Sequence, residues 1–79
     1  MTDAEIVAVI HEVARAHLGV TTTMDMQTPL VEALALDSLR MITLVAELEN
    51  SFKICFETGD EMGLVTLADL VALVRRRLP

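Results

Sequence analysis

The chain has room for only one hydrophobic core, because it contains 79 residues. Domains of this size bury only about 60% of the surface that their unfolded chains expose, which is too little for two separate cores. We therefore predict a single domain over residues 1–79. Trp and Tyr are absent, and the only aromatic residues are Phe52 and Phe56. Because strands are enriched in aromatic residues, this composition favours an all-α fold.

The beginning of the chain carries the signals of a helix. Thr2 and Glu5 have the spacing of a capping box, in which two side chains satisfy free N–H groups at a helix start. Apolar residues then recur at helical spacing, in a series made of Ile6, Val9, Ile10, Val13 and, at its end, His17. The pattern predicts a helix from Asp3 to Leu18 that ends at Gly19, since glycine enters the left-handed conformation without steric cost.

A long connection follows from Val20 to Leu36, where no period holds and Thr28-Pro29 marks irregular backbone. Loops of this length in compact domains are usually functional or disordered. We expect this one to be ordered, with a helical turn from Pro29 to Glu32. Five apolar side chains can anchor it to the core, namely Met24, Met26, Leu30, Leu34 and Leu36.

The second predicted helix runs from Ser38 to Phe52, a stretch without Gly or Pro that Asp37 precedes as a good N-cap. One side of this helix is expected to face the core, with Met41, Leu44, Val45, Leu48 and Phe52. A second apolar patch, made of Leu39, Ile42 and Ala46, lies on a different arc and should face solvent.

The last third of the chain predicts one short helix and one longer helix. Residues Glu57 to Met62 are assigned to the short helix, which Gly63 would end. Thr66 and Asp69 read as a second capping box, opening a helix with Leu67, Leu70, Val71 and Val74 facing inward. The expected architecture is thus a bundle of three main helices plus one short helix, with a long first loop.

The charge of the chain restricts its partners. Twelve acidic and six basic residues give a net charge of −6, and three of the basic residues are Arg75 to Arg77. This excess of negative charge disfavours nucleic acid and anionic membranes and favours partners with basic patches. The three arginines are expected to complement the negative end of the last helix dipole. No apolar run approaches the ~20 residues of a bilayer span, so we predict a cytoplasmic protein.

The sequence offers little for catalysis or for metal binding. Cys55 is the only cysteine, which excludes an internal disulfide, and we expect it to be a small buried hydrophobe. His11 and His17 lie on different sides of the first helix, so a shared metal ion is not expected. The three glycines are scattered and form no phosphate loop. We therefore predict no catalytic residue and no metal site.

One serine stands out by its position. In Leu36-Asp37-Ser38-Leu39 it is the first residue of a helix that follows a long loop. Taken alone, such a pair is an ordinary helix cap. In size, acidity and loop lengths, however, nearly the whole chain resembles the acyl carrier protein family. Thr66-Leu67-Ala68-Asp69-Leu70 resembles the family's usual opening of the last helix, and Phe52 closes the second helix where the family often has Phe.

The resemblance implies a function and a set of site residues. In the family, the serine of an Asp-Ser-Leu motif accepts 4′-phosphopantetheine from coenzyme A, and by resemblance Ser38 is that serine, flanked by Asp37 and Leu39. The arm's thiol then carries an acyl group as a thioester. Residues that match or flank the family's partner contacts are Leu39, Arg40, Ile42, Thr43, Ala46, Glu47 and Glu49. The implied partners of this stand-alone, monomeric carrier are a phosphopantetheinyl transferase and acyl-loading or acyl-processing enzymes, such as ligases or ketosynthases.

Three positions depart from the best-known fatty acid carriers and leave the cargo open. Arg40 and Thr43 stand where those proteins usually have acidic residues, and Ala35 replaces a common glycine. The departures favour a dedicated pathway over ordinary fatty acid synthesis, although fatty acid, polyketide and other acyl cargo all fit. An aminoacyl or peptidyl carrier and an unmodified helical interaction module are the alternatives. The methionines, among them Met24 and Met62, either repack around an inserted chain or only fill gaps.

Overall fold

The protein is an all-α bundle, described over residues 1–79 by a computed structural model. Its elements in chain order are α1 (Asp3–Leu18), α2 (Leu30–Ala33), α3 (Ser38–Phe52), the 3-10 helix η1 (Asp60–Gly63) and α4 (Leu67–Arg77). The only strand-like feature is an isolated bridge between Pro29 and Thr66. The predicted fold class is therefore confirmed. No helix is long and apolar enough to cross a lipid bilayer.

Local capping determines where the long helices begin and end. At the start of α1, the Thr2 hydroxyl accepts the Glu5 N–H and the Glu5 carboxylate accepts the Thr2 N–H. Thr66 and Asp69 make the same reciprocal pair at the start of α4. Gly19 ends α1 with φ 68°, in the left-handed region. The sequence predicted these boundaries correctly because each depends on residues within one turn of the helix end.

The three long helices enclose one apolar core of 18 buried residues. In α4 the four predicted inward residues are all buried, and so are Ile6, Ile10 and Val13 in α1. His17 is exposed, so the core-facing series in α1 ends before it. In α3, Leu44, Leu48 and Phe52 are buried, whereas Met41 and Val45 are only half-buried. The core-facing stripe of α3 is thus narrower than predicted.

Two predictions in the connection between α3 and α4 are wrong. The short helix begins at Asp60 rather than at Glu57, has 3-10 geometry, and includes Gly63 as its last residue. Gly59, with φ 91°, turns the chain immediately before it. Cys55 is exposed, because the irregular backbone here directs Ile54 into the core and leaves its neighbour outside. Such a connection has no helical period from which burial could be predicted.

An ion pair fastens this connection to the end of α4. Arg77 donates from Nη2 to Asp60 Oδ2 at 2.9 Å, and the Glu57 N–H donates to the same carboxylate at 2.8 Å. Hydrogen bonding to Arg77, followed by that to Glu57, lowers the pKa of Asp60 below its ordinary value. The charged carboxylate of Asp60 therefore stabilises the folded state.

The pH dependence of stability should report this pair. A carboxylate whose pKa is lowered by folding stabilises the fold above its unfolded pKa, about 3.9 for Asp, and ceases to do so as the pH falls through the lower folded value. We expect Asp60→Asn to be less stable than the wild type at neutral pH and to lose less stability on acidification below about pH 4. Urea unfolding at a series of pH values, followed by circular dichroism, measures this. Glu32→Gln, at an exposed residue without a side-chain hydrogen bond, is the control; equal pH slopes for Asp60→Asn and the wild type would contradict the argument.

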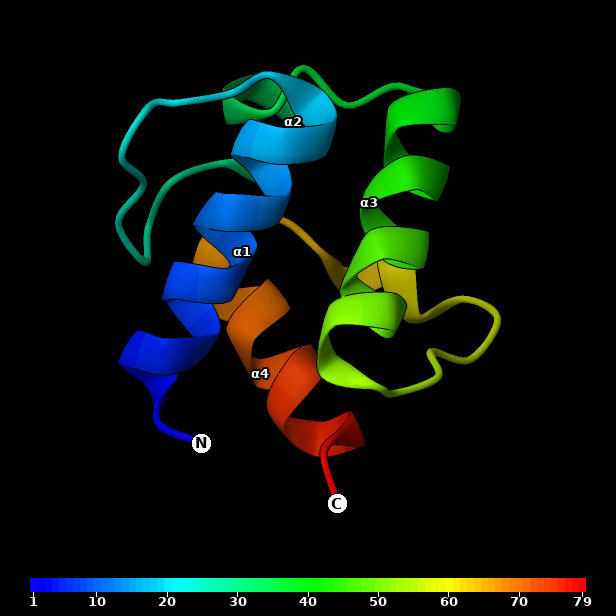
Figure 1. Ribbon diagram of the computed structural model, residues 1–79. Helices are drawn as coiled ribbons and strands as arrows, with labels where there is room; N and C mark the ends of the chain where they lie inside the picture. Colours follow the sequence, from blue (N-terminus) through cyan, green and yellow to red (C-terminus); the bar gives the residue numbers. More distant parts are fainter.

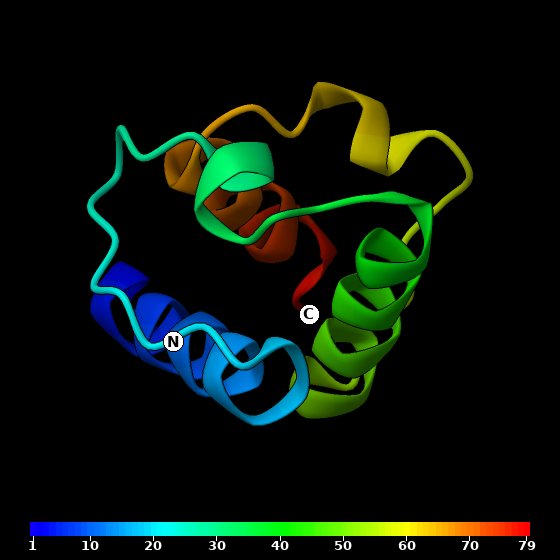
Figure 2. The ribbon, with the colours of Figure 1, turned by 90° about the horizontal axis from the view of Figure 1, so that it is seen from above.

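The arrangement of the helices sets the start of α3 apart from the chain ends. Both termini lie at one end of the bundle, and the connection from α2 crosses the opposite end to reach the start of α3 (Figure 1). Seen from above, α1 and α3 form two sides of the molecule, and α2 and η1 lie along a third side (Figure 2). The residue at the start of α3 is thus presented away from both termini.

Candidate functional site

Ser38 is the first residue of α3 and is exposed to solvent. The residue before it, Asp37, has extended backbone, with φ −121° and ψ −172°, and therefore stands outside the helix as its N-cap. This confirms the predicted helix start. The local sequence thus places a primary hydroxyl on the first turn of a helix, beside a connection that leaves it open to solvent.

The helix start around Ser38 has free hydrogen-bond donors. Asp37 Oδ1 accepts the Arg40 N–H at 2.8 Å, and the Asp37 carbonyl accepts the Met41 N–H at 2.9 Å. The backbone N–H groups of Ser38 and Leu39 have no partner within the chain. Unpaired N–H groups and the positive end of the helix dipole favour an anion at this position. The donor set therefore fits a phosphodiester attached to the Ser38 oxygen.

Arg40 lies on the same turn but directs its side chain into the molecule. Its Nε and Nη2 donate to the Leu34 carbonyl at 3.1 and 2.8 Å, and Nη2 also donates to the Leu18 carbonyl at 2.9 Å. Leu18 is the last residue of α1, and Leu34 is the C-cap of α2. The guanidinium group thus joins the ends of two helices to the beginning of a third.

The predicted apolar patch of Leu39, Ile42 and Ala46 faces solvent, as expected. Leu39 is 71% exposed and Ile42 is 65% exposed, and Ala46 is also exposed. An open groove of about 300 Å³ runs beside the patch, lined by Met41, Ile42, Val45, Ala46, Glu49 and Glu61. The patch is not covered by η1 or by the loops, although these were candidates to cover it.

The polar residues on this side of α3 are engaged within the chain. Glu47 Oε2 lies 3.1 Å from His17 Nε2, which is an ion pair when the histidine is protonated. Glu49 accepts the N–H of Phe56 at 2.8 Å, and the Thr43 hydroxyl donates to the Leu39 carbonyl at 3.1 Å. The outer face of α3 therefore offers exposed apolar side chains, whereas its two carboxylates already have partners in the fold.

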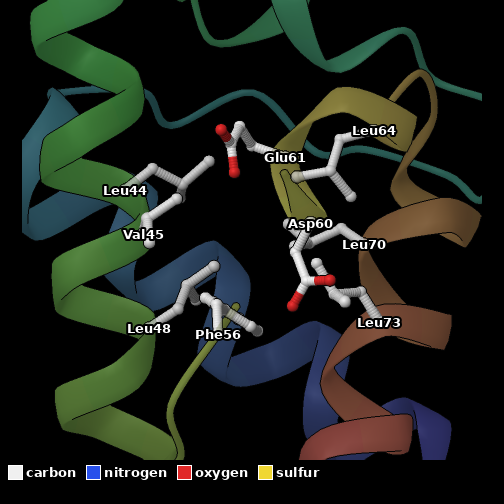
Figure 3. Close-up of a pocket in the computed structure, with 9 residues that line it drawn as sticks. All are labelled: Leu44, Val45, Leu48, Phe56, Asp60, Glu61, Leu64, Leu70 and Leu73. Carbon is white, nitrogen blue, oxygen red and sulfur yellow. The ribbon is translucent and has the colours of Figure 1, made fainter. Parts of the chain in front are cut away.

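A second cavity lies inside the bundle, between α3, η1 and α4 (Figure 3). Its lining residues are Leu44, Val45, Leu48, Phe56, Asp60, Glu61, Leu64, Leu70 and Leu73. Its volume of about 10 Å³ is roughly that of one water-sized sphere. Met24 is buried and Met62 is 85% exposed, so Met62 fills no gap in the core. The core in this state has no room for an acyl chain.

Other polar side chains stabilise the fold rather than form a second site. The ring of His11 accepts the Met24 N–H through Nε2 at 2.9 Å, and its Nδ1 lies 3.0 Å from the Val7 carbonyl. This pair of contacts ties the long first loop to α1. No group of three or more His, Cys, Asp or Glu side chains is placed to hold a metal ion.

Comparisons with known proteins indicate a family for this chain. The family described as a phosphopantetheine attachment site matches residues 6–74. A curated relative, an acyl carrier protein homolog of Mycoplasma genitalium, is 40% identical over 99% of this chain and 94% of its own length. A solved structure from Mycobacterium tuberculosis that is assigned as an acyl carrier protein has a TM-score of 0.71 and 26% identity, and the match covers 95% of this chain and 97% of that one.

This chain belongs to the acyl carrier protein family. Members of this family are carriers rather than enzymes, and the family match is consistent with a carrier as the functional class. The family match also implies an attachment site for 4′-phosphopantetheine.

Proposed function

We propose that Ser38 carries 4′-phosphopantetheine and that the chain, acting as one monomeric carrier domain over residues 1–79, holds an acyl group on this arm as a thioester. The observation that carries the proposal is the exposed Ser38 hydroxyl at the start of α3, where two backbone N–H groups lack partners in the chain. The family match supports the identity of the arm. Asp37 and Leu39 flank the attachment point, Asp37 as the N-cap and Leu39 as the donor of one free N–H.

The attachment is a transfer between phosphate esters. The Ser38 oxygen forms a new bond to the phosphorus of the phosphopantetheine half of coenzyme A, and the bond between its two phosphates breaks. The adenosine bisphosphate half leaves, and the hydroxyl proton passes to a base of the transferase. The free N–H groups at the start of α3 then lie beside the resulting negative charge.

A tethered arm explains how a chain without catalytic residues takes part in synthesis. The bound arm supplies a thiol, and an acyl group held there as a thioester reaches each docked enzyme at a high effective concentration. The partners in this proposal are a phosphopantetheinyl transferase and the enzymes that load and process the acyl group, all in the cytoplasm. The lack of an acidic side chain at Arg40 and at Thr43 supports a dedicated pathway, such as a polyketide or another specialised product, over ordinary fatty acid synthesis.

The test is modification of the purified chain. Incubation with coenzyme A and a broad-specificity phosphopantetheinyl transferase should raise the intact mass by one arm, and peptide mapping should place the arm on Ser38. A chain that gains no mass would be an unmodified helical module, and the proposal would be abandoned. A modified chain that accepts aminoacyl groups but no acyl groups would instead be a carrier of nonribosomal synthesis.

The outer face of α3 is the proposed docking surface for these enzymes. Leu39, Ile42 and Ala46 are its exposed apolar centre, and Thr43 lies among them. Glu47 and Glu49 flank this centre, but each already has a partner in the chain. Because the free carboxylates on this face are few, the docking should depend more on apolar contact and less on salt than charge-driven docking does.

A charge placed in the centre of this surface should weaken docking. We expect Ile42→Asp to raise the KM of the transferase for the carrier about tenfold with little change in kcat, since desolvating a carboxylate opposes burial of the patch. Initial rates at varied carrier concentration measure both constants. Ala72→Asp, at an exposed residue of α4, is the matched control. An unchanged KM for Ile42→Asp would place the docking surface elsewhere.

A further inference from the structure

The connection that presents Ser38 contains a strained residue. Ala35 has φ 50°, in the left-handed region, which is sterically unfavourable for a residue with a Cβ atom. The intrinsic backbone preference of Ala35 therefore does not stabilise this turn, and other contacts must do so. The hydrogen bond from the Leu36 N–H to the Val31 carbonyl, at 2.9 Å, is one local contact that supports it.

The guanidinium group of Arg40 supplies the remaining support from outside the turn. It makes two hydrogen bonds to the Leu34 carbonyl, directly before Ala35, and one to the Leu18 carbonyl, 22 residues away in the sequence. Both carbonyls stand at helix ends, where the backbone carries partial negative charge and a cation is favoured. Three bonds from one planar group restrict both the place and the orientation of α3 relative to α1 and α2.

We infer that Arg40 is a positioning residue for the modification of Ser38, an assignment that rests on the proposed function. It is placed two residues after Ser38 on the first turn of α3, and its own N–H is capped by Asp37 at 2.8 Å. The Arg40 side chain thus holds the first turn of α3 against the ends of α1 and α2, and this turn determines the position of the Ser38 hydroxyl. The cation serves this internal link, so it does not face an incoming transferase as a free charge.

The kinetic test separates positioning from docking. Arg40→Gln removes the charge and the fork of donors, whereas Arg40→Lys keeps the charge on a single ammonium group. With coenzyme A at saturation, we expect Arg40→Gln to lower the kcat of arm transfer about tenfold, because small displacements of a reacting group reduce rates steeply. KM for the carrier should change little, and Arg40→Lys should have a kcat between that of Arg40→Gln and the wild type.

A second readout follows the turn itself and needs no transferase. Hydrogen exchange of the Leu36 amide should be faster in Arg40→Gln than in the wild type by about tenfold, while amides in the middle of α1 keep their protection. Arg76→Gln, at an exposed arginine of α4 whose side chain makes no hydrogen bond, is the matched control for both measurements. If Arg40→Gln does not fold, the kcat and the exchange of Arg40→Lys decide.

The outcomes are distinguishable from failure of the proposed function. A wild-type chain that gains no arm would end the proposed function, and the exchange measurement would still test whether Arg40 holds the turn. An Arg40→Gln chain with normal kcat and normal Leu36 exchange would overturn the inference. So would a variant that is modified faster than the wild type, since that would make Arg40 an obstacle to docking.

Discussion

A Ser38→Ala chain is expected to gain no arm from coenzyme A under conditions in which the wild type is fully modified. The substitution removes the only hydroxyl at the start of α3 and leaves the N-cap, Asp37, in place. Because Ser38 is exposed and is not part of the core, the substitution should leave the fold intact. Circular dichroism checks this. The measurement is the intact mass after incubation with the broad-specificity transferase.

The chain itself offers the control for this prediction. Ser51 is the only other serine, is also exposed, and also belongs to α3, but lies in its last turn. Ser51→Ala should gain one arm as the wild type does. An arm on the Ser38→Ala chain would show that the positive end of α3 does not select the attachment point, and the proposed function would then need another residue.

The second large effect concerns stability. Leu44 is fully buried in α3 and lines the small cavity with Leu70 and Leu73 from α4 (Figure 3). Leu44→Ala should lower the free energy of unfolding by about 2–5 kcal/mol, because it removes apolar contacts and enlarges the cavity. A domain of this size has a total stability of only about 4–12 kcal/mol, so part of the population should be unfolded at 37 °C if the total is low.

Ile42→Ala provides the comparison, since it truncates a similar side chain only two residues away on the exposed face of α3. Its effect should stay within about 0.5 kcal/mol, as for most surface substitutions. Urea unfolding followed by far-UV circular dichroism suits a chain that lacks Trp and Tyr. Equal losses from the two truncations would mean that the core does not lie where the structure places it.

The fold could be predicted from the sequence wherever its signals are local. Thr2, Asp37 and Thr66 each bond to an N–H three residues later, so the three helix starts follow from short patterns. Gly19 marks the end of α1 in the same way. The segment after Phe52 could not be predicted as well, because neither the 3-10 geometry of η1 nor the exposure of Cys55 depends on a repeating pattern.

The residues of the candidate site likewise differ in whether a local sequence pattern predicts their role. The proposal of Ser38 as the attachment residue rests on its own helix cap and on resemblance to a family, both of which can be read from a sequence. The link made by Arg40 joins residues that are 6 and 22 positions apart, and no local pattern announces such a contact. Likewise, the partners of Glu47 and Glu49 come from α1 and from the connection after α3. A sequence shows that these side chains are charged, whereas only the fold shows that they have partners within the chain.

The tight interior of the bundle has a consequence for any cargo that is to be shielded from water. A space of about 10 Å³ between α3, η1 and α4 admits no alkyl chain unless these elements move apart. A loaded carrier that hides its cargo must then place α3 differently relative to η1 or α4 than an empty one does. An enzyme that grips the outside of α3 could in that case distinguish a long cargo from a short one by the shape of the carrier alone, without touching the cargo.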